Sequence, residues 1–460
     1  MARLVPRAVL HIDEAQLDLI EEEAAHLLAY VGLEVPLAEA LEQLCAFSEV
    51  RVRGERVYLE EDYVSKQLRS LHRPTADVDW RLEVTAGGGA LNILDAGSTS
   101  PRPATTADLL RCFRVCDHLG LGGDPPVVPH DIPMPLCEVA LYKLAWQHTR
   151  AFSGRDISSV AVGEYVYEMA IATGKPFSLP LYMISPLRIN VENLALALHF
   201  RERLNAIAVG TMPMPGATAP LLAPGYLAQA LAEAFGGYAI ATMLLPQART
   251  EFGFKLLAFD PYANALGCGS PESLLQGQLE VALLARYGKR PVHHFWSMAG
   301  GADQQAAAER MAGILLGALA GVRSFGVAGR LQGEAFSLEQ LLLDLEIAYY
   351  VERILRGQLW QPEGNWLQET RRALEEGTFL GHDTTAAFFR QETWQSRLFD
   401  RHTFADRITL GLPGLSERLR TWLAELESRP DETLHLMPEV ERELERIYES
   451  AVHSLQMRRL

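Results

Sequence analysis

The sequence lacks the features of a membrane protein and of an exported protein. Its longest apolar stretches, Tyr238 to Leu245 and Met311 to Leu319, fall well short of the roughly 20 residues that a membrane-spanning helix needs. The first residues, MARLVPRAVLHIDEAQ, contain no continuous apolar run and no small-residue cleavage site, so they do not resemble a secretion signal. We therefore expect a cytoplasmic protein without a membrane segment.

Cysteine is scarce, with five residues in the chain. An odd, sparse set does not form a disulfide framework, so reduced thiols are expected. Cys112 and Cys116 lie four residues apart, as zinc ligands can, but His118 would project from another face of the same helix, which favours buried structural cysteines. The sequence also has no HExxH motif and no Walker phosphate loop. We therefore predict no bound metal.

An excess of basic residues is also missing, because 42 Lys and Arg face 58 Asp and Glu, a formal net charge of −16. Binding to a nucleic-acid backbone depends on clustered Lys and Arg, so nucleic acid is not expected as a partner. A small cationic molecule would suit this charge better, although acidity also simply keeps enzymes soluble.

The chain has 460 residues, of which 48% are hydrophobic, enough to bury one large core. Residues 1–75 are predicted to form an N-terminal helical cap, since Leu17, Ile20 and Ala24 recur at helical spacing after Asp13, a plausible N-cap. A short strand or turn is expected near Val57. Residues 346–460 are predicted to form a charged, helical C-terminal extension.

Residues 76–345 show the sequence pattern of an α/β domain, because short apolar runs alternate with longer helical ones. Seven or eight such runs, most followed by a helix, favour a closed parallel (β/α)8 TIM barrel over an open sheet. No GxGxxG turn follows the first strand, and Gly87 to Gly89 read as a plain turn. The predicted strands are ALNIL at Ala90, VV at Val127, AFSG at Ala151, FSLPLYMI at Phe177, AIAVGTM at Ala206, TEFGF at Thr250, VHHFW at Val292 and VRSFGV at Val322.

Active groups of such a barrel lie on the loops after the strands, and these loops are rich in polar and aromatic residues. His293 and His294 are adjacent on a strand, so only one of them can face the interior, and either can instead be a structural histidine. The residues expected to form the substrate pocket are His130, Asp131, Glu251, Phe254, Glu272, His294, Trp296 and Gln305.

Aromatic and acidic residues near the strand ends have two possible roles. Phe252, Phe254, Trp296 and Tyr182 could enclose a quaternary ammonium group by cation–π attraction, or could belong to the core. Glu251 and Glu272 could complement a cationic substrate, or could pair with Arg249 or Arg290.

Nine stretches, taken in chain order, resemble the trimethylamine methyltransferase family, whose members include glycine betaine methyltransferases that lack pyrrolysine. No residue of this sequence is pyrrolysine. The stretches begin at the residue given for each: LLAYVGLEVPLAEALEQL (Leu27), RPATTADLLR (Arg102), VVPHDIP (Val127), ISPLRIN (Ile184), MPMPGATAP (Met212), GSPES (Gly269), ADQQAAAE (Ala302), SLEQLLLDLEIA (Ser337) and GTFLGHDTTAAFFRQETWQSRLFDR (Gly377).

The resemblance implies a barrel whose mouth docks a cognate corrinoid protein, which supplies the cobalamin-type cofactor and receives a methyl group from a quaternary or tertiary amine. It also implies a homo-oligomer. The segment WSMAGGA departs from the family's Thr/Asp/Ser/Lys stretch before Asp303 and Gln305, and Thr384 replaces the histidine of the late FLxxxHT motif, with His382 two places earlier. Two alternatives stay open: a diverged barrel that binds methylated amines or a corrinoid protein without turnover, and a barrel enzyme of other chemistry.

Overall fold

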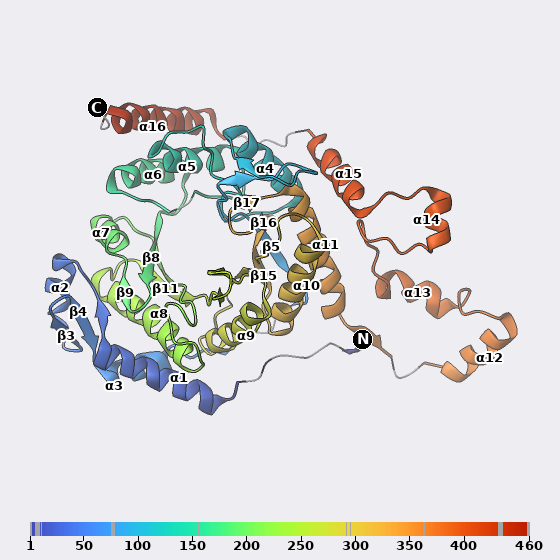
Figure 1. Ribbon diagram of the computed structural model, residues 1–460, viewed down its shortest axis with the longest axis horizontal. Helices are drawn as coiled ribbons and strands as arrows, with labels where there is room; N and C mark the ends of the chain where they lie inside the picture. The colour runs from blue at the N-terminus through green and yellow to red at the C-terminus, as the bar shows by residue number, and fades with distance from the viewer. Residues whose placement is uncertain are drawn as a thin grey trace.

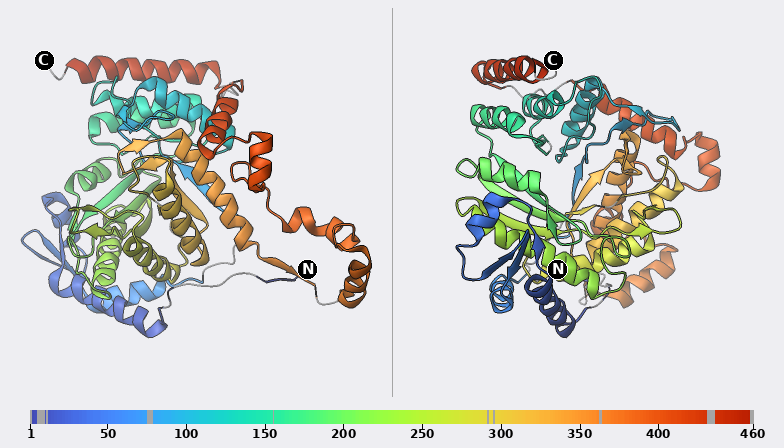
Figure 2. Two further views of the ribbon diagram at one scale, coloured as in Figure 1. Left: turned by 45° about the vertical axis from the view of Figure 1, so that its right-hand side comes forward. Right: turned by 60° about the vertical axis from the view of Figure 1, so that its left-hand side comes forward.

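Strands lie inside a ring of helices, and several C-terminal helices extend away from this ring (Figures 1 and 2). The computed structural model describes residues 2–4, 10, 12–74, 79–154, 156–290, 292–294, 296–361, 364–430 and 436–457. The inner strands are parallel and form two arcs.

The first arc contains three parallel strands in the spatial order β8, β10, β11. All three were predicted from apolar runs that are each followed by a helix, and they are confirmed. Their bounds are Ser178–Ile184 for β8, Ala206–Thr211 for β10 and Arg249–Phe254 for β11.

The second arc contains β14 (His293–His294), β15 (Ser324–Ala328) and β5 (Glu83–Ala86), again parallel. Single parallel bridges extend it from Ala86 to Gly123 and from Gly123 to Phe152. The two arcs together contain eight segments, and within each arc neighbouring segments follow the cyclic order of the chain. The segments are β5, those at Gly123 and Phe152, β8, β10, β11, β14 and β15. Among the described residues, however, the ladder is open between Phe152 and β8 and between β11 and β14. The structure thus shows a mixed α/β fold with two parallel arcs, and the closed barrel is not seen as a continuous ladder.

The beginning of the core differs from the prediction. ALNIL forms β6 (Asn92–Ile93), which belongs to a small separate sheet, whereas the first inner strand is the unpredicted β5. Backbones pass very closely here, since a Cβ on Gly87 would lie 2.1 Å from the Asp124 carbonyl oxygen. Glycine is therefore required for packing, and it dilutes the apolar pattern that reveals a strand. The partners of β6 are β7 (Arg102–Pro103), β16 (Arg330–Leu331) and β17 (Ala335–Phe336).

Eight helices surround the two arcs (Figure 1). α8 is apolar on all sides because it packs on the first arc and on the N-terminal segment. It is also the one described helix long and apolar enough to cross a membrane, and 83% of that stretch is buried inside the structure. The helices are α4 (Thr106–Leu119), α5 (Leu136–His148), α6 (Val160–Thr173), α7 (Val191–His199), α8 (Gly225–Leu244), α9 (Pro271–Ala285), α10 (Gln304–Leu319) and α11 (Leu338–Leu355).

The N-terminal segment is only partly the predicted helical cap. Asp13 caps its first helix as expected, accepting a hydrogen bond from the Gln16 backbone. A hairpin of two strands follows, because valines and leucines alternate there and bury one face. This hairpin joins the first arc, so the segment extends the sheet as well as covering it. Its elements are α1 (Glu14–His26), a π-helical turn (Leu27–Val31), β2 (Leu33–Glu34), α2 (Ala38–Leu44), β3 (Val50–Arg53), β4 (Arg56–Leu59) and α3 (Glu61–Ser70), and β9 (Arg188–Ile189) links it to β8.

The C-terminal segment is helical, as predicted. α15 packs against α4 and α11, and α16 packs against α5 and α6. The three helices before them project from the ring (Figure 2). The elements are β18 (Gln358–Trp360), which pairs with β1 (Ala2–Leu4), and α12 (Trp366–Glu376), α13 (Asp383–Glu392), α14 (Phe404–Leu410), α15 (Leu415–Glu427) and α16 (Pro438–Met457).

All five cysteines are free thiols, and only Cys45 is exposed. Burial raises the pKa of Cys112 and Cys116 and raises the pKa of Cys268 to about 11. Since the thiolate is the reactive form, we expect one thiol to react rapidly with Ellman's reagent in the folded protein and all five to react in guanidinium. Two or more rapid thiols in the folded protein would contradict this prediction.

Candidate active site

Helix carboxylates hold the loops that follow the strands. Glu233 of α8, which is fully buried, accepts hydrogen bonds from the Ser185 hydroxyl at 2.7 Å and the Leu187 backbone at 3.0 Å, and also from the Thr211 hydroxyl. These residues stand at the carboxyl ends of β8 and β10. One buried side chain therefore fixes two neighbouring loops.

The same arrangement recurs at the next strands. Glu280 of α9 accepts from the Leu256 backbone at 2.8 Å, after β11. Glu309 of α10 accepts from the Met298 backbone at 3.0 Å, after β14, and Asp344 of α11 accepts from the Gly329 backbone at 2.8 Å, after β15. The loops at the carboxyl ends are thus held in place, as a binding site requires. The role of these carboxylates could not be recognised from the sequence, because acidic residues on helices usually face solvent.

The inner face of the first arc carries small and polar residues. Ala208 pairs in register with Pro180 and Glu251, and these positions alternate with buried ones that face α8. Gly253, on the same inner face, has no atom within 4 Å of where a Cβ would stand. The inner face is therefore open enough to admit a small molecule.

Phe254 and Glu251, two of the residues predicted to form the pocket, have other neighbours than the sequence indicated. Phe254 shares the outer face of β11 with Phe252, whose ring packs against Phe235 of α8, so Phe254 is not a wall of the interior. Glu251 does lie on the inner face, where it pairs with Arg249 at 3.0 Å. The ion-pair alternative for Glu251 is the one that the structure shows.

The segments that follow β11 and β14, together with α9, enclose a polar corner. Lys255, Cys268, Glu280, His293 and Trp296 line one small cavity there. Burial lowers the pKa of Lys255, while the nearby Glu280 carboxylate opposes that shift. Burial also lowers the pKa of His293 to about 3, so its imidazole is neutral at pH 7. This corner offers a neutral histidine, an amine and an aromatic ring.

His293, one of the two adjacent histidines of β14, lies on the helix side of the strand, buried against Gly277 of α9 and Gly317 of α10. The side chain of His294 lies outside the described part of the structure. The Trp296 ring stacks beneath the guanidinium of Arg330, 5.4 Å from the ring centroid.

Two further predicted residues, Gln305 and Glu272, lie in the first turns of α10 and α9. Gln305 donates to Glu309 at 2.7 Å, and Glu309 also accepts from Ser297 beside Trp296, so these residues belong to the polar corner. Glu272 is exposed in the first turn of α9.

His130 and Asp131 are exposed on the loop before α5. Asp131 accepts from the Thr106 backbone at 2.8 Å, at the start of α4, which gives it a structural partner. Among the residues that the structure describes, no hydrogen bond or ion pair joins His130 or Asp131 to the polar corner, so the two lie apart from it.

Exposed apolar side chains surround the loops at the carboxyl ends. Leu91 follows β5, Leu221 and Leu222 lie between β10 and α8, and Tyr262, fully exposed, lies between β12 (Phe259–Asp260) and β13 (Ala265–Leu266). We call these four residues the apolar rim. All four side chains are exposed and follow strands of the two arcs.

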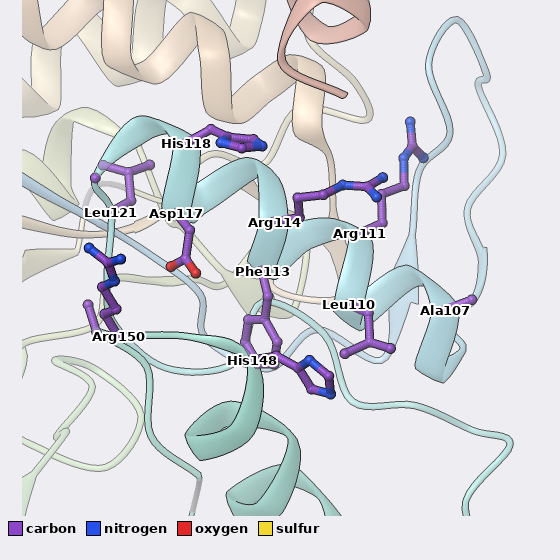
Figure 3. Close-up of a pocket in the computed structure, with 12 residues that line it drawn as sticks. Ala107, Leu110, Arg111, Phe113, Arg114, Asp117, His118, Leu121, His148 and Arg150 are labelled. Atoms are coloured by element: carbon purple, nitrogen blue, oxygen red, sulfur yellow. The ribbon is translucent and has the colours of Figure 1, made fainter. Parts of the chain in front are cut away.

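A cavity of about 670 Å³ lies at the other end of the strands, beside the loops that lead into Gly123 and Phe152. Arg111 and Arg114 project from one side of α4, whereas Asp117 projects from the other, toward Arg150 (Figure 3). Because the charged groups diverge, they do not converge on one ligand. Within the described ranges, no group of three or more His, Cys, Asp or Glu side chains could hold a metal ion.

Comparisons with known proteins place this geometry in context. A family model described as trimethylamine methyltransferase (MTTB) matches residues 4–447. The chain is 25% identical over 436 residues to a glycine betaine methyltransferase of Desulfitobacterium hafniense, covering 88% of this chain and 89% of that protein. It is 30% identical over 249 residues to the trimethylamine methyltransferase MttB2 of Methanosarcina mazei, covering 53% and 50%. The crystal structure of the Methanosarcina barkeri monomethylamine methyltransferase (MtmB) aligns over 94% of this chain and 97% of its own at 12% identity, with a TM-score of 0.44.

Proposed function

The chain belongs to the trimethylamine methyltransferase family, and from this premise we propose that it transfers a methyl group from a quaternary or tertiary amine to the corrinoid of a partner protein. The family match over residues 4–447 is the observation that carries the proposal. We further propose that the two arcs form one (β/α)8 barrel over residues 76–345, with residues 1–75 and 346–460 as added segments, and that the enzyme acts in the cytoplasm.

The chemistry explains why the site needs few ionisable groups. A quaternary amine, or a tertiary amine bound in its protonated form, carries its methyl group on a positively charged nitrogen and leaves as a neutral amine, so no residue has to protonate the leaving group during the transfer. The corrinoid, when bound, supplies the electron pair that forms the new bond to the methyl carbon. The protein has to hold the methyl group in line and exclude water. Burial keeps His293 neutral at pH 7, so this histidine adds no positive charge to the corner.

The residues at the carboxyl ends are the proposed contacts. We assign Trp296 and Gln305, in the polar corner, and His294 beside them to the substrate, with Glu272 at the entrance. His130 and Asp131 would contact the substrate or the partner from the other side of the mouth. Glu251 would act from deeper on the inner face, and Phe254 would support the wall from outside.

The mouth also fits a partner that carries a large planar group. The apolar rim offers a surface for a protein, and Gly253 and Ala208 leave open space below it. We therefore propose that the corrinoid protein docks on the apolar rim. Docking there would close the mouth against water.

Incubation with a reduced corrinoid and a panel of quaternary and tertiary amines tests the function. We expect the visible spectrum to change to that of the methylated corrinoid with one amine. Trp296→Ala should raise KM for that amine about tenfold, since a cation–π contact in a desolvated site contributes about 1–2 kcal/mol. Trp360→Ala, at an exposed tryptophan on β18, should leave KM unchanged.

The controls separate the alternatives. Free cobalamin and the corrinoid protein should be tried in parallel with an active family member. Amine binding by calorimetry without methyl transfer to either acceptor would contradict the proposal and indicate a protein that binds without turnover.

A further inference from the structure

Lys255 directly follows the last residue of β11, at the carboxyl end of that strand. Its backbone N–H donates to the Thr211 carbonyl at 2.9 Å, so the pairing of β11 with β10 continues through it. Alternation along the strand then places its side chain on the inner face, with Glu251 and Gly253. Lys255 is partly exposed, and Gly253 leaves open space on the same face. A small molecule in the interior can therefore reach the amine.

Lysine is an uncommon choice of base in this chain. Of the 42 lysines and arginines, five are lysines, namely Lys66, Lys143, Lys175, Lys255 and Lys289. An arginine keeps its proton in proteins, whereas the amine of a lysine can lose its proton and act as a nucleophile. Lys255 is the lysine that lines the polar corner. It therefore offers a chemistry to this corner that the abundant arginines cannot supply.

Two buried side chains that line the cavity beside Lys255 each have a polar atom without a hydrogen-bond partner among the described residues. Glu280, 1% exposed, accepts from the Leu256 backbone with Oε2, and its Oε1 has no partner. His293, 7% exposed, has an unpartnered Nδ1. Such atoms are unfavourable to bury, and each calls for a bound or reacting group. The cavity measures about 20 Å³, which holds one water-sized group such as a carbonyl oxygen.

Burial destabilises the charged forms of both Lys255 and Glu280. It lowers the pKa of Lys255 and raises the pKa of Glu280, while the attraction between the two charges opposes both shifts. Burial also raises the pKa of Cys268 to about 11 and lowers that of His293 to about 3, so these two neighbours are neutral at pH 7. Lys255 and Glu280 can therefore hold one proton between them.

We propose that Lys255 is a nucleophile that forms an imine with a small aldehyde, and that Glu280 is the acid and base of this reaction. An aldehyde fits the small cavity better than a ketone, because its carbonyl carbon carries a single substituent. The proposed function does not use Lys255, so the inference stands whether or not methyl transfer occurs.

The reaction needs no oxidant or reductant. The amine nitrogen forms a bond to the carbonyl carbon, and the carbonyl oxygen takes a proton from Glu280. The nitrogen then returns a proton to Glu280, which passes it to the new hydroxyl group. The hydroxyl leaves as water while the nitrogen lone pair forms the C=N bond. The products are a positively charged imine, the Glu280 carboxylate beside it and one water molecule.

Reductive trapping on the full chain tests the proposal. Acetaldehyde with cyanoborohydride at pH 7 adds an ethyl group to each lysine that forms an imine, and mass spectrometry of the peptides measures the rate at all five lysines. We expect Lys255 to be labelled at least about tenfold faster than the exposed Lys66 and Lys175, because each unit by which a pKa falls raises the neutral fraction about tenfold. A lysine that is merely buried would be labelled more slowly than these two, and that result would overturn the proposal.

Glu280→Gln tests the acid and base, because its amide oxygen can still accept from the Leu256 backbone. It should lower the rate at Lys255 at least about tenfold and leave the rates at Lys66 and Lys175 unchanged. Circular dichroism would show that the variant folds. An unchanged rate at Lys255 would overturn the role of Glu280.

Glu352→Gln is the matched control, because Glu352 also accepts from a backbone N–H, that of Leu82 at 2.7 Å, but at the amino end of β5. It should leave the rate at Lys255 unchanged. A protein that methylates the corrinoid and yet labels Lys255 slowly would keep the proposed function and overturn this inference.

Discussion

Replacing Arg310 with methionine should lower the free energy of unfolding by about 3–5 kcal/mol, because it leaves a buried charge without its partner. Arg310 of α10 and Asp344 of α11 are both fully buried, with Nε and Oδ1 3.4 Å apart. Burial raises the pKa of Asp344, and the Arg310 charge opposes that shift. Arg310 also donates to the Arg330 carbonyl, so the loop after β15 should shift in the variant.

Denaturant unfolding and the apparent melting temperature would measure this loss in the free energy of unfolding. A loss of that size is a large fraction of the stability of a typical protein. Arg201→Met is the matched control, because Arg201 lies in an exposed ion pair with Glu39 at 3.8 Å and should contribute less than about 1 kcal/mol. Arg310→Met with Asp344→Asn should recover part of the loss, since no charge then stays buried and the amide oxygen can still accept from Gly329. Equal stability of Arg310→Met and Arg201→Met would show that the pair is not required.

Glu233→Ala should lower the free energy of unfolding by a similar amount, because it removes the hydrogen-bond acceptor of four donors at once. These donors are the Ser185 hydroxyl, the Leu187 backbone, the Thr211 hydroxyl and the Gln229 amide. A buried donor without a partner costs about 1–3 kcal/mol, so a loss of about 3 kcal/mol or more is expected. Methyl transfer should also fall at least about tenfold, since misplacement of a loop by an ångström can cost 100-fold in rate.

Glu233→Gln separates the loss of the hydrogen bonds from the loss of packing, because it keeps the shape of the side chain and one acceptor oxygen. Its stability should lie between those of Glu233→Ala and the unchanged protein. Unfolding experiments on the three proteins, together with the rate of corrinoid methylation, would check the order. If Glu233→Ala keeps both its stability and its rate, the two loops are held by other contacts.

The strands of the first arc could be predicted because their pattern is local. The segments at Phe177, Ala206 and Thr250 each combine a run of apolar residues with a helix that follows, and all three became strands. β5 was missed because it has four residues and leads into three glycines, of which Gly87 makes a close contact with a backbone 37 residues away at Asp124. A contact of that kind leaves no local pattern.

The loops that follow the strands could be predicted, but the partners of their side chains could not. Alternation along β11 shows that Phe252 and Phe254 share a face, yet only packing against α8 decides that this face is the outer one. Glu251 had two possible partners in the sequence, and the structure pairs it with Arg249. From the sequence alone, the carboxylates that hold the loops cannot be distinguished from ordinary surface residues. Only the folded structure shows that they bind the loops after the strands.

The sequence by itself determined the family, through motifs in a fixed order, and it determined the first helix, the helical C-terminal segment and the three strands of the first arc. These properties follow from residue types and spacings along the chain. Only the tertiary structure decided which groups meet, such as Arg310 with Asp344 and Glu233 with two loops. The physical reason is that burial and ion pairing depend on groups distant in the chain, as Leu82 and Glu352 are.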